Sequence, residues 1–321
     1  MNTGLSSLRS LGVLVQQNVA LSQWTTFRLG GPCPWFISCA TPQQLTAAIC
    51  CLAAEKTPFI LIGGGSNLVV SDQGVSCAVI RYVSDKPIID HSDDEIMAAG
   101  STNLDSLALY AAEHGLEGLN YTSGIPGTVG GAVVGNAGAF GKQAGDVLIK
   151  AGLISRTGER RYASREELGF TYRNSRLKET GEIIATVTFS VSKGDREALL
   201  KERAEILEIR HEKHPDLNAY PCAGSFFRNI EPTSKAEKRQ AAGWFLEQAG
   251  GKDLSVGGAK IFDKHANIIV KAQGCTAKNV YELAQKMAGL VKKAYGFDLV
   301  REVRFVGRLE GVKESEKELI W

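Results

Sequence analysis

The stretch Ser123-Gly124-Ile125-Pro126-Gly127-Thr128-Val129-Gly130-Gly131-Ala132 continues to Gly135-Asn136-Ala137-Gly138-Ala139, and it holds seven glycines between residues 123 and 141 with no charged residue. A backbone this rich in glycine lets a large anionic or aromatic ligand lie directly on main-chain amides. The stretch is long enough to span a bilayer, but its glycines and prolyl residue exclude a transmembrane helix. A buried glycine-rich helix, packed at close range, is the alternative that stays open.

A second glycine loop lies earlier in the chain, where the expected strand Pro58–Ile62 runs into Gly63-Gly64-Gly65-Ser66-Asn67 and the expected strand Leu68–Val70 follows. A Rossmann turn is disfavoured because Leu68 stands at the third glycine position and no helix follows. The Gly-Lys-Ser/Thr sequence of a Walker loop is absent. A plain tight turn is the alternative for this loop alone. Together the two loops predict a dinucleotide held across an α+β domain, with its pyrophosphate on backbone amides.

Apolar periodicity and turn residues predict alternating helices and strands along the rest of the chain. The longest expected helices are Asp195–His211, which would connect two parts of the molecule, and Thr276–Tyr295. Ser101–Gly115 is expected to be a helix that starts with a capping box of Thr102 and Asp105. The other expected elements are helices after Thr41-Pro42 and at Glu237–Ala249, and strands at Cys77–Tyr82, Val147–Ser155, Glu182–Val191, within Lys260–Val270, and at Leu299–Val306.

The composition is that of a globular protein with more than one domain. Of 321 residues, 44% are hydrophobic and 22% are charged, and 37 Lys and Arg against 35 Asp and Glu leave a formal charge of +2. Such a chain has no sequence-wide attraction to nucleic acids or anionic membranes. The apolar run Leu11–Val15 is too short for a signal peptide, and seven cysteines without a CxxC pair predict reduced thiols. We therefore expect a cytoplasmic protein with no nucleic acid, membrane, metal or obligate protein partner.

Both glycine loops, Ile62-Gly63-Gly64-Gly65-Ser66-Asn67-Leu68 and Ser123–Gly131, resemble the FAD-binding region of the UDP-N-acetylenolpyruvoylglucosamine reductase family. The loops alone would indicate only a flavoprotein of the vanillyl-alcohol oxidase type. Motifs specific to this reductase follow in family order, and they are Phe170-Thr171-Tyr172-Arg173-Asn174-Ser175, Ala223-Gly224-Ser225-Phe226-Phe227-Arg228-Asn229 and Arg301-Glu302-Val303-Arg304. The resemblance also includes Thr25-Thr26-Phe27-Arg28-Leu29-Gly30-Gly31 near the start.

The resemblance implies an α+β flavoprotein of three parts: FAD-binding subdomain 1 at residues 1–72, FAD-binding subdomain 2 at residues 73–212 and a substrate-binding domain at residues 213–321. It implies non-covalent FAD, NADPH as hydride donor, and a UDP-sugar substrate. The reaction would reduce the enolpyruvyl double bond of UDP-N-acetylglucosamine enolpyruvate to UDP-N-acetylmuramate, in peptidoglycan precursor synthesis. Two rivals are a flavin oxidase on the same scaffold and a catalytically silent nucleotide-binding protein.

The resemblance implies three catalytic residues, Ser225 as proton donor and Arg173 with Glu302 as groups that stabilise the intermediate. Hydride addition to an alkene conjugated to a carboxylate moves negative charge onto the carboxyl group, so the site needs electrophilic groups and an acid. Arginine binds carboxylates bidentately. A serine hydroxyl is an effective acid only beside a group that stabilises its alkoxide. From the residues alone, a turn-forming Ser225 and a surface Arg173 stay open.

Glu302 lies in a segment, Val300–Val306, in which alternate residues share one face if the segment is a strand. Glu302 and Arg304 are then expected to project together between Val300 and Val306. Desolvation on such a face would raise the pKa of the carboxyl group and Arg304 would lower it. If desolvation dominates, a protonated Glu302 can donate a hydrogen bond to the enolate. A solvated ion pair on an outer face is the alternative.

The resemblance assigns substrate binding to Tyr172, Asn229 and Arg304. Cofactor binding falls on positions in or near the glycine loops, and these are Gly63, Gly64, Gly65, Ser66, Asn67, Leu68, Ser123, Gly124, Ile125, Pro126, Gly127, Gly130, Gly131, Asn136 and Gly138. In the better-known subtype of the family, a tyrosine-bearing insertion follows the Tyr-Arg-x-Ser motif. Here only Arg176–Gly181 separates that motif from the next expected strand, so the chain resembles the shorter subtype.

Overall fold

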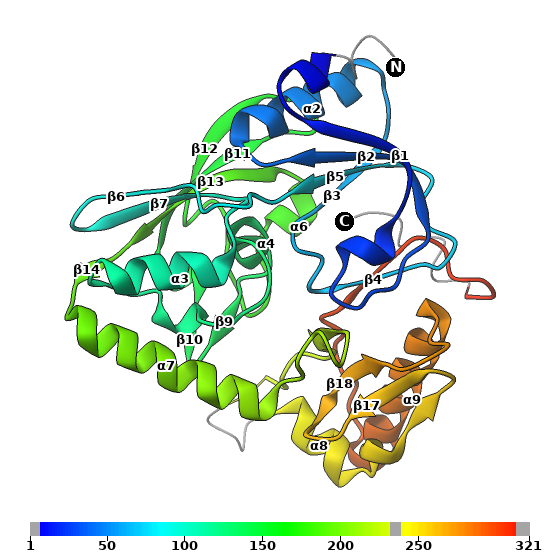
Figure 1. Cartoon of the computed structure of the whole chain (residues 1–321). Helices are drawn as coiled ribbons and strands as arrows, with labels where there is room; N and C mark the ends of the chain where they lie inside the picture. The colour runs from blue at the N-terminus through cyan, green and yellow to red at the C-terminus, as the bar shows by residue number, and fades with distance from the viewer. Residues whose placement is uncertain (1–6, 232–238, 313–321) are drawn as a thin grey trace.

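The molecule has an upper part built on two large β-sheets and a lower C-terminal domain built on a third (Figure 1). The computed structural model describes residues 7–231 and 239–312. Helix α7, Arg196–Lys213, runs along the upper part and leads the chain into the C-terminal domain. Within the described ranges, no helix combines the length and apolar character that crossing a bilayer requires.

Helix α2, Pro42–Ala54, packs against the first sheet and buries Leu45 and Ile49 there. β1 is antiparallel to β2, whereas β2 and β3 both run parallel to β5. Because β5 lies beyond residue 72, this sheet takes strands from both sides of the first expected domain boundary. The three-part division stays a prediction. In spatial order the strands are β1 Leu14–Ala20, β2 Pro32–Cys39, β5 Ala78–Tyr82 and β3 Phe59–Ile62.

The second sheet is antiparallel throughout and is covered by helices α3, Leu104–Glu113, and α4, Val129–Val134. Helix α4 lies inside the long glycine stretch, so part of that stretch is helical, but only Val129 and Val133 of this helix are buried. Asn103 caps α3 by accepting from the Ser106 N–H, so the predicted capping box was wrong. In spatial order the strands are β12 Arg160–Ser164, β11 Leu148–Ile154, β13 Ile183–Ser190, β7 Glu95–Ala99 and β6 Ile89–His91.

The C-terminal domain packs helices α8, Ala242–Gln248, and α9, Ala277–Tyr295, on its own antiparallel sheet. Helix α9 confirms the helix expected at Thr276–Tyr295, and Thr276 caps it by accepting from the Asn279 N–H. Helix α8 begins later than predicted because Gln240 pairs with Ile230; residues 237 and 238 lie outside the described residues. In spatial order the strands are β15 Cys222–Ser225, β18 His265–Lys271, β17 Ala259–Phe262 and β16 Ser255–Val256.

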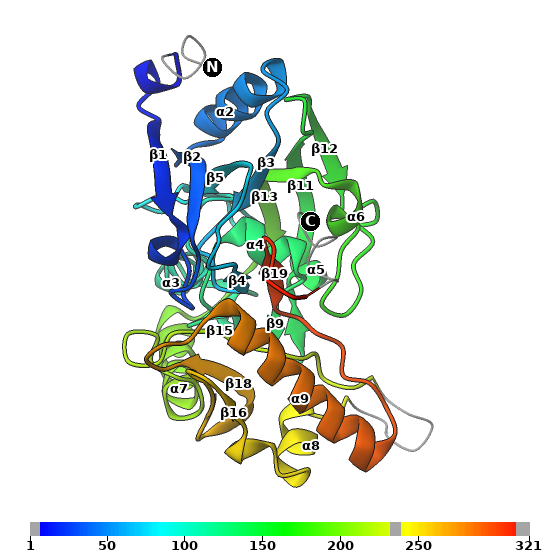
Figure 2. The same ribbon diagram turned by 90° about the vertical axis from the view of Figure 1, so that its right-hand side faces the viewer.

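The two parts are tied together by the parallel pair of β4, Leu68–Val70, and β19, Arg304–Val306. Figure 2 shows the C-terminal segment rising from the lower domain to place β19 in the upper part. The predicted strand Leu299–Val306 was too long. Arg301 pairs with Phe227 in the lower domain, and the chain then changes partners before residue 304.

The remaining elements are short and mostly connect the sheets. They are the 3-10 turns η1 Leu21–Trp24, η2 Asn120–Thr122 and η3 Gly251–Asp253, the helices α5 Ala144–Val147 and α6 Leu177–Thr180, and the paired strands β8 Leu116–Glu117 with β14 Ser192–Lys193 and β9 Gly138–Ala139 with β10 Lys142–Gln143.

Candidate active site

The two glycine loops predicted from the sequence lie against each other. The Ser66 hydroxyl donates to the Pro126 carbonyl at 2.9 Å. A Cβ built on Gly64 would lie 3.3 Å from the Cα of Gly127, and one built on Gly127 would lie 2.8 Å from the Ser66 Oγ. Gly127 also has a φ of +126°, which side chains rarely allow. A larger residue here would push the loops apart, so we call the paired loops, 63–68 and 123–127, the glycine cradle.

An ion pair of buried Arg203 with half-buried Asp105 supports the cradle on the side of α3 and α7. The Asp105 carboxylate accepts from the Gly124 N–H at 2.7 Å and from both terminal nitrogens of Arg203 at 2.7 and 2.9 Å. Burial alone would raise the pKa of Asp105, but the hydrogen bonds from Arg203 and Gly124 outweigh it and lower the pKa. Asp105, predicted as a helix cap, instead joins α3 and α7 to the cradle.

The cradle fits a bound FAD. The Ser123 hydroxyl is buried and has no hydrogen-bond partner among the residues described, although such groups are almost always paired. It is therefore available to a polar group held between the loops. Both loops are uncharged and offer backbone N–H groups, which suits a pyrophosphate.

The far end of the glycine stretch holds the turn that carries Arg173. Asn136 is fully buried, and its side-chain amide donates to the Thr171 carbonyl at 2.8 Å and to Gln143. Its carbonyl oxygen accepts from the Gly145 N–H. These bonds occupy both amide protons of Asn136, and its backbone N–H donates to the Val133 carbonyl, so Asn136 has no proton left to donate to the predicted cofactor.

Arg173 sits at the tip of a tight turn in which Thr171 and Asn174 exchange backbone hydrogen bonds. Its φ is +54°, a left-handed conformation that is uncommon for a residue with a side chain. An Arg173 Nη donates to the Gly138 carbonyl at 2.9 Å. The turn therefore points the guanidinium from the second sheet toward the C-terminal segment.

Glu302 reaches the same place from the other end of the chain. Its Oε1 lies 3.5 Å from the Arg173 Nε, and each side chain is about a quarter exposed, at 26% and 24%. Its N–H donates to the Phe226 carbonyl at 2.9 Å, and its carbonyl accepts from the Asn67 amide at 3.2 Å. The structure thus brings Arg173, Glu302 and the first glycine loop together, while their catalytic roles stay predictions.

Burial raises the pKa of Glu302 above its ordinary value, against the opposing effect of Arg173, Arg228 and Lys178. The predicted direction of desolvation agrees with this, but the predicted apolar face was wrong at one end. The effect of Arg304 on the Glu302 carboxyl group stays a prediction. Val300 is 57% exposed and so does not line an apolar face, because the segment is not a strand until residue 304.

Ser225 ends β15, directly before Phe226, whose carbonyl binds the Glu302 N–H. Gly224 before it takes a φ of +75°, and a Cβ there would meet nothing within 4 Å. Phe226 and Phe227 are buried in the core of the C-terminal domain, which fixes the backbone at Ser225. The serine is therefore held on a rigid strand end beside the glutamate segment.

The three predicted substrate residues lie near this cluster with different surroundings. The Arg239 guanidinium lies over the ring of Tyr172, 3.9 Å from the ring centroid. The Asn229 side chain accepts from the Ala242 N–H at 3.2 Å and so holds the start of α8. The Arg304 N–H donates to the Asn67 carbonyl at 3.1 Å. Their roles toward the substrate stay predictions.

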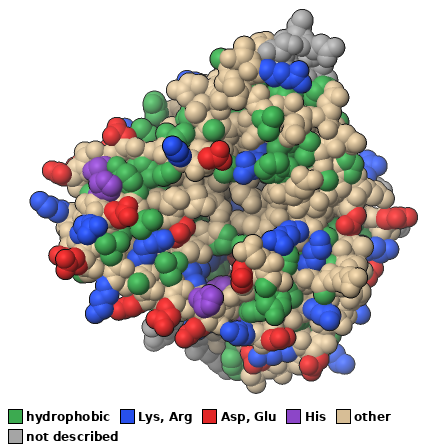
Figure 3. All heavy atoms as spheres, viewed as in Figure 1, with side chains coloured by type: hydrophobic (Ala, Val, Ile, Leu, Met, Phe, Trp, Pro, Cys, Tyr) green, Lys and Arg blue, Asp and Glu red, His purple; other side chains and the backbone are tan. Residues whose placement is uncertain are grey.

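Two cations of the cluster were missed by sequence reasoning. The Lys178 Nζ donates to the Arg173 carbonyl at 2.7 Å, and Arg228 lowers the pKa of both Lys178 and Glu302. The Arg228 Nε is buried without a hydrogen-bond partner among the residues described. Arg228 lies inside the Ala223–Asn229 motif, which could have pointed to it, whereas nothing in the sequence sets Lys178 apart from an ordinary surface cation. Figure 3 shows Lys and Arg side chains on both sides of the recess between the C-terminal domain and the upper part.

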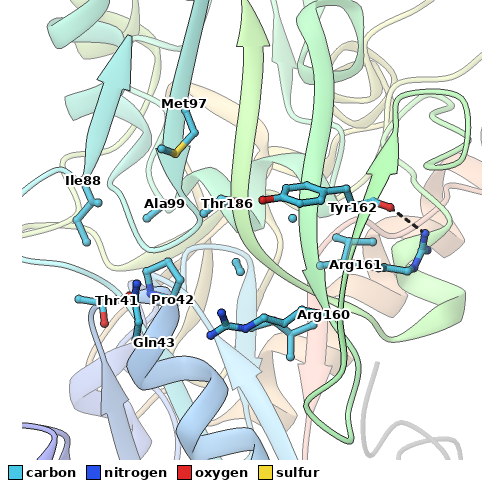
Figure 4. Close-up of a pocket in the computed structure, with 14 residues that line it drawn as sticks. Thr41, Pro42, Gln43, Ile88, Met97, Ala99, Arg160, Arg161, Tyr162 and Thr186 are labelled. Carbon is cyan, nitrogen blue, oxygen red and sulfur yellow. Dashed lines mark hydrogen bonds between the residues drawn. The ribbon is translucent and has the colours of Figure 1, made fainter.

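A hollow of about 500 Å³ lies elsewhere, between the start of α2 and the second sheet (Figure 4). Pro42, Met97 and Tyr162 line it, together with the stem of Arg160. None of the predicted site residues borders it. The hollow is open and mostly apolar, so it lacks the convergent polar groups that the cluster offers.

Comparisons with known proteins agree with this site. Residues 34–164 match the family of FAD binding domains, and residues 215–306 match the C-terminal domain of UDP-N-acetylenolpyruvoylglucosamine reductase. The first range contains the whole glycine cradle, and the second contains Ser225 and Glu302. The predicted α+β flavoprotein with a separate C-terminal domain, and the predicted FAD cofactor, are confirmed.

The relatives extend over nearly the whole chain. UDP-N-acetylenolpyruvoylglucosamine reductase of Anoxybacillus flavithermus is 36% identical over 92% of this chain and 95% of its own. That of Gloeobacter violaceus is 35% identical over 92% and 97%. The crystal structure of the reductase from Thermus caldophilus, 32% identical, covers 91% of this chain and 99% of its own with a TM-score of 0.75. The chain therefore belongs to the UDP-N-acetylenolpyruvoylglucosamine reductase family of FAD-dependent oxidoreductases.

Proposed function

We propose that the chain reduces the enolpyruvyl double bond of UDP-N-acetylglucosamine enolpyruvate to give UDP-N-acetylmuramate for peptidoglycan synthesis, with NADPH as the source of electrons. The single observation that carries this proposal is the Arg173–Glu302 pair at 3.5 Å, held against the first glycine loop by the Asn67 bond to Glu302. This arrangement places groups that stabilise a carboxyl-linked negative charge beside the cradle.

The cradle's own residues would hold the cofactor through their backbone and the Ser123 hydroxyl. FAD supplies a hydride to the terminal carbon of the enolpyruvyl group when it is bound there. The protein must then stabilise the charge that moves onto the substrate carboxyl group, and it must deliver a proton to the adjacent carbon. Both tasks fall to the charged cluster.

Arg173 and Glu302 are suited to the first task. The Arg173 guanidinium keeps its charge and binds a carboxylate in two-point fashion. Because burial raises the pKa of Glu302, its protonated form persists to higher pH than that of an ordinary glutamate. A protonated Glu302 can donate a hydrogen bond to an enolate oxygen, whereas an ionised one would repel it.

Ser225 is suited to the second task if nearby cations stabilise its alkoxide. Its strand end is joined through Phe226 to the Glu302 segment, and Arg228 follows three residues later. We assign Ser225 the proton donated to the α-carbon. The surrounding positive charge of Lys178, Arg228 and Arg304 also suits the carboxylate and diphosphate of a sugar nucleotide, for which Tyr172, Asn229 and Arg304 are the proposed contacts.

We further infer that the protein works in the cytoplasm, because NADPH and UDP-sugars are the reactants it would need. Purified protein tests the whole proposal. It should be yellow, NADPH should bleach the flavin absorbance, and UDP-N-acetylglucosamine enolpyruvate should restore it in the absence of oxygen. A colourless preparation that also refuses added FAD would contradict the proposal, as would reduced enzyme that only oxygen can reoxidise.

A further inference from the structure

Lys178 lies in α6, the short helix between the Tyr172–Ser175 motif and β13. Its Nζ donates to the backbone carbonyl of Arg173 at 2.7 Å. A lysine in so short and polar a segment would ordinarily extend into solvent. Here the side chain instead turns back toward the catalytic cluster and is half-buried.

The residue that Lys178 holds has an unfavourable backbone. Arg173 takes a φ of +54°, and a side-chain-bearing residue keeps that conformation only where surrounding contacts fix it. The Thr171–Asn174 hydrogen bonds close the turn, and Gly138 anchors the guanidinium. The Lys178 bond fixes the carbonyl side of the same residue. Arg173 is thus held at both its backbone and its side chain.

We propose that Lys178 is a positioning residue for Arg173, whose charged hydrogen bond to the Arg173 carbonyl fixes the direction in which the guanidinium meets Glu302 and the substrate. This inference rests on the proposed function, because it concerns the step in which substrate charge is stabilised. It assigns Lys178 a role that acts through the backbone of Arg173.

The charges around Lys178 make this role depend on pH. Burial, Arg228, Arg304 and Arg173 lower the pKa of Lys178 to about 8, and Glu302 opposes them. The ammonium form is therefore present below about pH 8 and is lost as the pH rises through that value. A neutral amine is a weaker donor than an ammonium group. The hold on Arg173 should weaken over the same range.

Three substitutions separate the possible contributions of this side chain. Lys178→Arg keeps a charged donor that does not titrate, Lys178→Gln keeps an uncharged donor, and Lys178→Met keeps only an apolar stem. Lys150→Met, at an exposed lysine in β11, is the matched control. Each variant would be reduced with NADPH without oxygen, and the second-order rate constant for reoxidation by UDP-N-acetylglucosamine enolpyruvate would be followed by stopped flow from pH 6 to 10. Far-ultraviolet circular dichroism and flavin content would report folding.

At pH 7 we expect Lys178→Met to reoxidise at least about 10-fold more slowly than the parent, the range for loss of one charge-assisted hydrogen bond. Lys178→Arg should stay within about threefold of the parent, and Lys178→Gln should lie between them. The parent rate should fall as the pH passes about 8, and this fall should be absent in all three variants. Lys150→Met should keep both the rate and the fall.

A Lys178→Met rate within twofold of the parent would overturn the inference, as would Arg and Gln variants no faster than Met. If Lys178→Met loses its circular dichroism signal, the Arg and Gln variants carry the test through their rates and pH profiles. A parent enzyme that the substrate cannot reoxidise at any pH contradicts the proposed function instead. The two failures are therefore distinguishable.

Discussion

The glycine cradle and the charged cluster are neighbours, but they are built in opposite ways. The cradle uses backbone from two loops, and its geometry depends on side chains being absent at positions such as Gly64 and Gly127. The cluster uses long charged side chains from the turn at Arg173, the helix at Lys178 and the C-terminal segment at Glu302. Each loop of a backbone site can be recognised from a short stretch of sequence. A side-chain cluster, in contrast, forms only when segments that are distant in the sequence pack together.

The largest effect is expected from a substitution that disrupts only the glycine cradle. Gly127→Val should remove nearly all copurified FAD, because the new side chain would be strained at a φ of +126° and would strike Ser66. Gly141→Val is the matched control, since Gly141 also has a positive φ but meets nothing within 4 Å. Flavin absorbance against circular dichroism measures the difference. Stoichiometric FAD in a folded Gly127→Val protein would mean that the loops are plain turns.

The next largest effect is expected from a substitution in the charged cluster that leaves the glycine cradle unchanged. Ser225→Ala should bind FAD and accept electrons from NADPH at the parent rate, because Ser225 is proposed to act only on the second substrate. Reoxidation by the enolpyruvyl substrate should slow by about 100- to 10,000-fold, the range for loss of a general acid. Ser192→Ala, in the short strand β14, serves as the control. Slow reduction by NADPH in Ser225→Ala would show that the proposed role is wrong.

A smaller effect distinguishes two ways in which the cluster can stabilise charge. Glu302→Ala should lose on the order of 100- to 1000-fold in reoxidation, as expected when one donor aimed at a developing charge is removed. Glu302→Gln should lose less, because an amide keeps a donor of similar size and the raised pKa of Glu302 favours its neutral form. Stopped-flow reoxidation compares the two. Equal losses would indicate that Glu302 works ionised, by orienting Arg173.

The smallest effect concerns the ion pair that supports the cradle. Asp105→Asn should lower the free energy of unfolding by roughly 1 to 2 kcal/mol at pH 7, a value reduced from that of a fully buried pair because the Asp105 side chain is 37% exposed. The pKa of Asp105 is lowered in the fold. Its contribution is therefore complete above its unfolded pKa of about 4, and it is lost as the pH falls through the folded value.

Urea unfolding of the parent and of Asp105→Asn, at pH 7 and again at pH 3, measures that difference. The gap between the two proteins should narrow at the lower pH. A gap of the same size at both pH values would mean that the charge of Asp105 contributes nothing, and that its hydrogen bond to Gly124 accounts for the stability.

The sequence predicted most elements and the cradle because their signals are local. Helix α9 follows from apolar spacing behind Thr276, and the loop at Gly63–Asn67 follows from strands on both sides. The pairing of β4 with β19 could not be predicted, since the segment that ends in β19 begins in one domain and finishes in another. Lys178 was missed for a related reason. Its partial burial is produced by the packing of other segments, and in the sequence it is one lysine in the short, mostly polar stretch Arg176–Gly181.

The β4–β19 pair also sets an order of events during protein synthesis. Asn67 and Glu302 are 235 residues apart, so the strand beside the cofactor loop must emerge from the ribosome long before its partner. Until residues 304–306 are made, the edge of β4 that β19 will cover has unpaired backbone groups, a state that invites wrong pairing. A nascent chain can fold its first sheet early. It acquires the glutamate and closes that edge only after residues 302–306 have been translated.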